Sequence, residues 1–196
     1  MKHITMDNQQ ESLLWWFGGI IDGEGCITIN HNRLHRNTQK ETLLFRPLIA
    51  IVNTNKILID TCIEILRTNE IPFFVQYHQA QEKMKEKWDI RIEGLKRNAK
   101  ALTILSPYII SKKQEASLVK RFCDIRLARP KEKTSYGGMA TPLYGDEEFE
   151  IILEVAKIHN RNPQRLYAEI REYKEKQRPQ TIRNRENGRF TRQDIV

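Results

Sequence analysis

Residues 13–25 read Leu-Leu-Trp-Trp-Phe-Gly-Gly-Ile-Ile-Asp-Gly-Glu-Gly, and this segment is the most informative part of the sequence. Its apolar run predicts a helix over about 10–22 that ends in the sequence Asp22-Gly23-Glu24-Gly25. A helix C-terminus carries a partial negative charge, so each carboxylate there is unfavourable by roughly 0.3–1 kcal/mol at an exposed site. A cation held close to both acids would offset that cost. Asp-Gly is also an ordinary turn signal, and in that interpretation the acids need no partner.

Two glycines lie in the middle of the same predicted helix. Gly18 and Gly19 each cost about 1 kcal/mol relative to Ala at a helix interior position. Glycine is tolerated there when another backbone must approach closely. The pair therefore predicts that this helix packs against a partner helix.

Residues 17–25 resemble the signature helix of the LAGLIDADG homing endonucleases. Phe17 stands at the Leu of the motif, Gly18 at its Ala and Gly19 at its first Gly. The resemblance implies that Glu24, at the last acidic position, is the catalytic carboxylate that binds the metal. The main-chain carbonyl of Gly23 is the expected second ligand. Asp22 is expected to order the helix end or to lie behind the metal ligands.

The sequence contains one copy of this motif. A single carboxylate site cannot readily cut both DNA strands, and single-motif members of the family solve this as homodimers with their signature helices side by side. The resemblance thus implies that Gly18 and Gly19 let two copies of the helix approach each other. A protein with two-fold symmetry implies a palindromic or near-palindromic DNA site.

Net charge and composition limit the kinds of partner and cellular compartment that fit this protein. The formal charge of +8 favours a nucleic acid, although an acidic membrane surface or simple solubility also fits. No apolar stretch approaches the ~20 residues of a transmembrane helix, and we expect neither a signal peptide nor a membrane partner. Three cysteines without framework spacing suggest free thiols in a reducing intracellular compartment, such as a bacterial or phage cytoplasm or an organelle.

Hydrophobic periodicity predicts the order α-β-β-α-β-β-α followed by further helices. The expected fold is a mixed α/β (α+β) domain with a four-stranded antiparallel sheet and helices on one face, and this is also the element order of the LAGLIDADG fold. The helices are expected over 10–22, 56–67, 95–105 and 111–128, and the strands over 26–32, 43–53, 71–79 and 86–93.

The chain divides by composition into four parts. We expect a core domain over 1–130, an irregular connector over 131–145, helices over 146–177 packed on the core, and a basic tail over 178–196. The tail is either a solvated segment or a contact to DNA phosphates.

Two more positions match catalytic-pocket positions of the family. Asn55 stands where the family places a polar residue that orders water, but capping of the next helix fits equally well. Lys112 stands in a segment that resembles the one delivering a basic residue to the phosphate. A solvated lysine at a helix start also fits Lys112, and Lys113 could take the catalytic role instead.

The polar face of the predicted sheet is the expected surface for reading DNA in the major groove. Amide and guanidinium side chains have the chemistry to read adenine and guanine edges. Leu48, Ala50 and Val52 fall in phase with the second-strand reader, and these three either contact thymine methyl groups or are buried. The candidate readers are Thr28, Asn30, Asn32, Arg46, Gln76, His78, Asp89 and Arg91.

These features together predict a single-motif homing endonuclease that hydrolyses both strands of a long, near-palindromic duplex. Mg²⁺ is the expected cofactor, and Mn²⁺ or Ca²⁺ could occupy its site. One alternative keeps the fold but not the cleavage, as an RNA-splicing maturase or a DNA-binding regulator. A second alternative sets the family aside and predicts a basic RNA- or ribosome-associated structural protein.

Overall fold

A computed structural model describes residues 6–35, 41–82, 84–130, 132–133, 139–140, 143–177, 182–183 and 190–191. Most of the predicted connector and basic tail lies outside these residues. Within the described residues, no helix is long and apolar enough to cross a membrane.

The predicted four-stranded antiparallel sheet is confirmed. Its order is β1-β2-β4-β3, and every neighbouring pair is antiparallel. Alternate residues such as Ile27, Ile49 and Ile90 are fully buried and share one face by register. The strands are β1 (Gly25–His35), β2 (Glu41–Asn53), β3 (Phe74–His78) and β4 (Lys87–Glu93).

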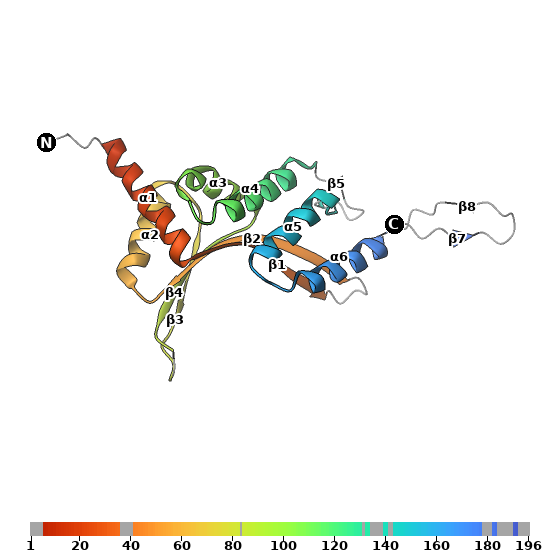
Figure 1. Cartoon of the computed structure of the whole chain (residues 1–196), viewed down its shortest axis with the longest axis horizontal. Coiled ribbons are helices and arrows are strands. Elements are labelled where there is room, and N and C mark those ends of the chain that lie inside the picture. The colour runs from red at the N-terminus through yellow and green to blue at the C-terminus, as the bar shows by residue number, and fades with distance from the viewer. Residues whose placement is uncertain are drawn as a thin grey trace.

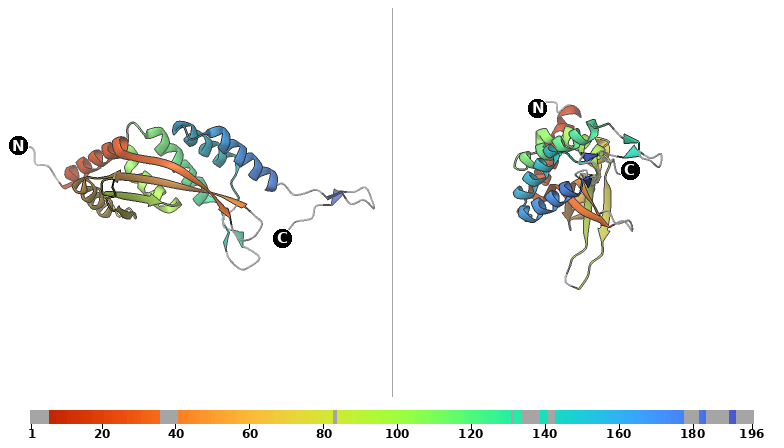
Figure 2. Two further views of the ribbon diagram at one scale, coloured as in Figure 1. Left: turned by 90° about the horizontal axis from the view of Figure 1, so that it is seen from below. Right: turned by 90° about the vertical axis from the view of Figure 1, so that its right-hand side faces the viewer.

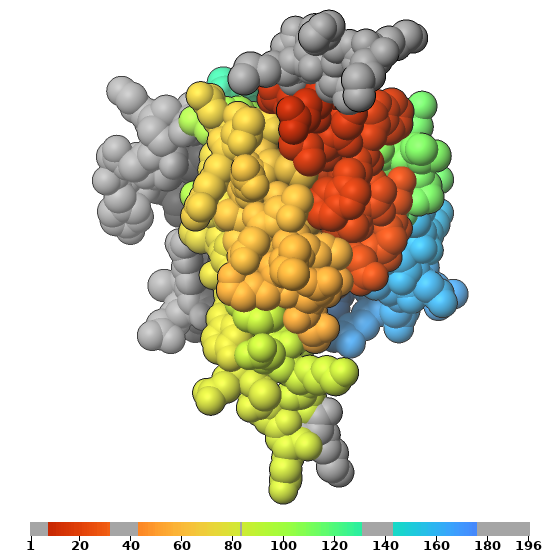
Figure 3. Space-filling view, turned by 90° about the vertical axis from the view of Figure 1, so that its left-hand side faces the viewer, coloured from red at the N-terminus to blue at the C-terminus, as the bar shows by residue number. Residues whose placement is uncertain are grey.

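The core helices gather on the apolar side of this sheet (Figures 1 and 2). The first helix runs to Glu24 rather than ending at 22, so both acids of the motif lie in its last turn. The β3–β4 hairpin projects away from the body of the molecule (Figures 1 and 3). The helices are α1 (Met6–Glu24), α2 (Lys56–Thr68), α3 (Leu95–Leu105), the short 3₁₀ helix η1 (Ser106–Tyr108) and α4 (Lys113–Ala128).

Two further helices, α5 (Asp146–Ile158) and α6 (Pro163–Gln177), extend the same hydrophobic core. Phe149 and Val155 of α5 and Ile170 of α6 are buried in it. The division of the chain into four parts stays a prediction. The remaining elements are two-residue strands, with β5 (Glu132–Lys133) paired to β6 (Met139–Ala140) and β7 (Ile182–Arg183) paired to β8 (Phe190–Thr191).

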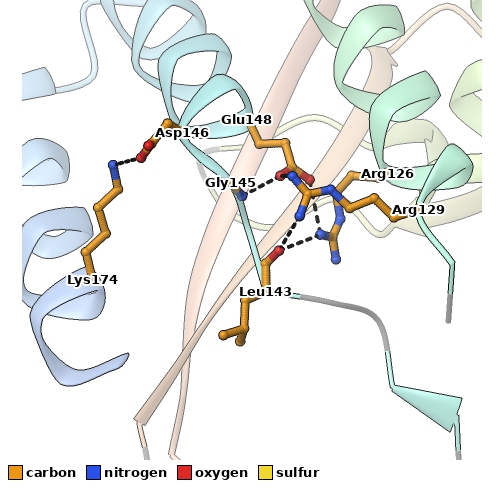
Figure 4. A network of polar contacts seen from close by, with 7 residues as sticks. All are labelled: Arg126, Arg129, Leu143, Gly145, Asp146, Glu148 and Lys174. Carbon is orange, nitrogen blue, oxygen red and sulfur yellow. Dashed lines mark hydrogen bonds and ion pairs between the residues drawn. The ribbon is translucent and has the colours of Figure 1, made fainter. Parts of the chain in front are cut away.

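A buried charge network fastens α5 to α4 (Figure 4). Glu148 is fully buried, and its carboxylate lies 3.1 Å from Arg126 Nη1 and 2.5 Å from Arg129 Nη2. The same carboxylate accepts a hydrogen bond from the Gly145 backbone N–H at the start of α5. The Arg126 guanidinium also covers the ring of Tyr144, whose hydroxyl accepts a hydrogen bond from a β2 backbone N–H. The start of α5 is therefore fixed to both α4 and the sheet.

We predict that Glu148→Gln lowers the free energy of unfolding by about 3–5 kcal/mol, because it leaves buried guanidinium charge uncompensated. Glu147→Gln is the matched control. Glu147 pairs with Arg121 at the surface, where both side chains are at least half exposed, so its loss should cost less than about 1 kcal/mol. Urea unfolding followed by circular dichroism measures both variants. Equal stabilities of the two variants would contradict the buried network.

Candidate functional site

The end of α1 brings together the acids of the motif. Leu14, Phe17 and Ile21 recur at helical spacing and are buried in the core, which fixes the helix against the sheet. The last turn of α1 contains no Lys or Arg of its own. Asp22 and Glu24 therefore sit at the negative end of the helix without a basic neighbour in that turn.

Asp22 is fully engaged within the protein. Its carboxylate accepts hydrogen bonds from the backbone N–H groups of Ile110, Ser111 and Lys112, at 2.8, 3.0 and 3.0 Å. These amides lead into α4, and the residue before that helix supplies no side-chain cap. Asp22 thus provides the anion that a helix N-terminus attracts, across a large separation in sequence.

Lys112, at the start of α4, in turn contacts the end of α1. Its ammonium donates hydrogen bonds to the main-chain carbonyls of Ile21 and Asp22, at 2.9 and 2.5 Å. These carbonyls belong to the last turn of α1, where the chain has unpaired acceptors. The chain itself therefore places a cation at the negative end of α1, where the sequence suggested that a cation would offset the cost of the two acids. A catalytic role of Lys112 stays a prediction.

The pKa of the Asp22 carboxyl lies below its ordinary value. Partial burial raises the pKa, but the hydrogen bonds from the backbone N–H groups of residues 110–112 and from the Ser111 side chain together lower it by more. A depressed folded-state pKa means that the carboxylate stabilises the fold at pH values above the ordinary value of 3.8. That contribution is lost as the pH falls through the lower folded value.

We predict that Asp22→Asn destabilises the protein by about 1–3 kcal/mol at pH 7, because an amide cannot serve all three backbone donors. The difference between wild type and variant should shrink as the pH falls below about 4, because this carboxyl is then protonated in the unfolded wild-type chain and, at still lower pH, in the folded protein. Urea unfolding at pH 3, 5 and 7 tests this. A stability difference that does not depend on pH would refute the assignment of the hydrogen bonds to an ionised Asp22.

Glu24 differs from Asp22 in both its exposure and its contacts. Its side chain is exposed, and it makes no hydrogen bond or ion pair with any residue that the structure describes. Gly23 beside it is also exposed, and an added Cβ there would meet nothing within 4 Å. Among the described residues, no group of three or more His, Cys, Asp or Glu side chains could enclose a metal. The carboxylate of Glu24 is thus open to ligands from outside this chain.

The two central glycines have different roles, and the expectation for Gly18 is corrected. A Cβ on Gly18 would lie 2.0 Å from the Tyr108 carbonyl oxygen, so this glycine admits η1 of the same chain. It therefore cannot present a free face to a second helix. Gly19 is exposed, and a Cβ there would meet nothing within 4 Å. Its place in a dimer stays a prediction.

Asn55 caps α2. Its side-chain oxygen accepts from the backbone N–H groups of Ile57 and Leu58, at 3.0 and 3.3 Å. This is the capping role that the sequence left open beside a catalytic one. Because Gly25 lies opposite Ile51, the end of β2 that leads to Asn55 lies at the same end of the sheet as Glu24. The catalytic role of its amide group stays a prediction.

The register places all eight candidate DNA readers on one face of the sheet, opposite the helices. Asn30 faces Arg46, and Asp89 lies between Val52 and Gln76. Thr28 and Asp89 are buried, whereas Arg46 and Gln76 are exposed. Asn32 occupies a register position on this face, but its side chain lies outside the described residues. The apolar residues of β2 on the same face are Leu48, which is buried, Ala50, which is half-buried, and Val52, which is exposed.

A short charge network orients one of these readers. Arg91 donates to Asp89 at 2.8 Å and to Glu93 at 3.3 Å. The hydrogen bond to Asp89 raises the pKa of the Arg91 guanidinium. The second oxygen of Asp89 is buried and has no hydrogen-bond partner among the described residues. This face thus presents a positioned guanidinium beside a buried acceptor.

The structure adds Arg161, a residue that the sequence did not single out. It lies in the turn between α5 and α6, and its guanidinium contacts Thr28 and Asn30. No periodicity in the sequence could reveal this contact, because the residues are more than 130 positions apart. The local pattern Asn160-Arg161-Asn162-Pro163 marks only the restart of a helix.

No protein-family model and no curated protein matches the chain. Several solved structures do. The homing endonuclease I-TnaI is 19% identical with a TM-score of 0.55, covering 81% of this chain and 96% of its own. The archaeal intron-encoded homing endonuclease I-Vdi141I, complexed with DNA, is 14% identical with a TM-score of 0.52, covering 78% and 85%. The homing endonuclease I-CvuI, bound to its target in the presence of Ca²⁺, is 14% identical with a TM-score of 0.50, covering 76% and 78%. The chain therefore has the LAGLIDADG homing endonuclease fold.

Proposed function

We propose that this protein is a site-specific, metal-dependent DNA endonuclease that acts as a homodimer on a long, near-palindromic duplex. The proteins of this fold compared above are homing endonucleases, and two of them were solved with DNA. The observation that carries the proposal is the division between the two acids of α1. Asp22 is held by three backbone amides, whereas Glu24 is exposed and without a partner among the described residues.

The exposed side of α1 supports a second copy as the partner. Trp16, Gly19 and Gly23 follow one another at spacings of three and four, so they lie on one helix face. Trp16 is 39% exposed, and neither glycine has an atom within 4 Å of an added Cβ. On α2, which forms this side of the molecule together with α1 (Figure 3), Ile57 is 79% exposed. Open glycines between exposed apolar side chains are what close helix pairing requires.

The residues at the end of α1 fit a divalent cation. Mg²⁺ takes one or two carboxylates together with water and phosphate oxygens, so a site without three protein ligands per chain is sufficient. Glu24 and the Gly23 carbonyl would hold the ion, with the second copy and the DNA completing its ligands. The bound metal would supply an activated water and neutralise charge on the leaving oxygen.

Other side chains near the end of α1 and on the sheet would have separate roles in catalysis and DNA binding. The side-chain nitrogen of Asn55 has no hydrogen-bond partner among the described residues and would orient water, because the α2 cap uses only the oxygen. Lys112 or the exposed Lys113 would place positive charge near the phosphate. The polar face of the sheet would lie in the major groove, where Arg46, Gln76 and Arg91 have donors for base edges.

We predict that Glu24→Gln abolishes cleavage, by about a hundredfold or more, while DNA binding is retained. The substrate is the duplex that the wild-type protein enriches from a randomised library, incubated with Mg²⁺. Glu11→Gln is the matched control, because Glu11 is an exposed acid on the same helix, far from its end. Undiminished cleavage by Glu24→Gln would refute the proposed catalytic site.

The same assay separates the alternatives. Sequence-selective binding of duplex DNA without cleavage by the wild-type protein would indicate a DNA-binding regulator. Preference for structured RNA over any duplex DNA would indicate a maturase or a structural RNA-binding protein.

Gly19→Ala tests the helix-paired dimer. The substitution should raise the helix stability of a single chain by up to about 1 kcal/mol, since the added methyl group meets nothing. It should weaken self-association by about tenfold or more, because the methyl group would stand between the two helices. Sedimentation equilibrium measures the self-association and urea unfolding at low protein concentration measures the stability, with Ser117→Ala on the exposed side of α4 as control. Unchanged self-association in Gly19→Ala would exclude this face as the interface.

A further inference from the structure

The turn between α5 and α6 is fastened to the edge strand of the sheet. His159 Nε2 lies 2.8 Å from the Ile27 carbonyl oxygen of β1. Asn160 and Asn162 both have positive φ angles, of 51° and 33°, a conformation that Asn adopts more readily than most residues. This backbone geometry brings Arg161 over β1.

The guanidinium of Arg161 lies on the polar face of β1. Its Nη1 donates to Thr28 Oγ1 at 3.2 Å and to Asn30 Oδ1 at 3.1 Å, and its Nη2 lies 4.0 Å from Cys26 Sγ. Cys26, Thr28 and Asn30 alternate along the strand, so all three point to the same side of the sheet. No carboxylate pairs with Arg161 among the described residues.

These contacts change what β1 can recognise. Adenine is read by an amide that uses its oxygen and its nitrogen together. The oxygen of Asn30 is taken by Arg161, and Thr28 is only 1% exposed. Neither predicted reader is therefore free to read bases as the sequence suggested.

Arg161 itself retains the donors for a different base. A guanidinium has five N–H donors in a planar fork, and Nη1 is occupied by Thr28 and Asn30. Among the residues that the structure describes, the edge formed by Nε and Nη2 makes only the long contact to Cys26. Such an edge fits the O6 and N7 acceptors of guanine.

We propose that Arg161 is a specificity-determining residue that reads a guanine in the major groove, with Thr28 and Asn30 as its positioning residues. The proposal rests on the proposed function of the sheet as a DNA-binding surface. A base contact is favoured over a phosphate contact because the guanidinium lies over the strand face itself. Its partner Asn30 stands directly opposite Arg46, another candidate reader, on the same face of the sheet.

The test uses the full-length chain and the duplex that wild type enriches from a randomised library without divalent metal. Binding is measured for every single base-pair substitution of that duplex, with wild type, Arg161→Ala, Arg161→Lys and Arg171→Ala. Arg171 is the matched control, because it is an exposed arginine of α6 that pairs with Glu175 rather than with the sheet.

For wild type and Arg171→Ala, we expect one G·C pair per half-site whose replacement weakens binding by about tenfold or more. Arg161→Ala should lose this preference at that position only, and the released Asn30 should shift the preference towards A·T. Arg161→Lys should also lose it, because lysine keeps the charge but not the fork.

Three results would overturn the proposal in distinguishable ways. A uniform loss of affinity across all duplexes in Arg161→Ala, with Arg161→Lys like wild type, would make Arg161 a phosphate contact. Identical preferences in all four proteins would make its contacts purely structural. If wild type enriches no duplex at all, the proposed function fails together with the assignment of Arg161.

Discussion

The reciprocal contact between the end of α1 and the start of α4 constrains the rest of the structure. Asp22 gives a carboxylate to the amides that lead into α4, and Lys112 gives an ammonium to the carbonyls that end α1. Each helix end thereby receives the charge that its dipole favours from the other helix. Because these helices pack against the same sheet, the contact fixes where the last turn of α1 lies and where it points.

This contact also explains why two neighbouring acids behave differently. The carboxylate of Asp22 stabilises the fold, and its pKa is lowered by its three backbone donors together with the Ser111 side chain. Glu24 stands two residues further along, so its side chain points away from those donors and towards solvent. Gly18 admits η1 on one side of the helix, while Gly19 and Gly23 leave another side uncovered. One helix thus combines an internal anchor, an open face and a free carboxylate.

The sequence was informative where local pattern determines structure. Apolar alternation in β1 and β4 predicted the sheet and its two faces, because residues i and i+2 of a strand share a side. The signature segment predicted the end of α1 within two residues. The sequence patterns could not predict contacts between segments that are far apart in the chain. Gly18 packs against the backbone of Tyr108, and Asp22 accepts hydrogen bonds from a loop near residue 110. Thr28 contacts Arg161. None of these contacts produces a periodic pattern in the sequence, and each one changed the role expected of a residue.

Asp22 anchors the fold, and we propose that Glu24 holds the metal. Electron paramagnetic resonance of Mn²⁺ titrated into the complex with the enriched duplex measures this most directly, since Mn²⁺ could occupy an Mg²⁺ site. We expect that folded Asp22→Asn still binds Mn²⁺ in the complex, whereas Glu24→Gln does not. Loss of Mn²⁺ binding in Asp22→Asn together with its retention in Glu24→Gln would reverse the roles assigned to the two acids.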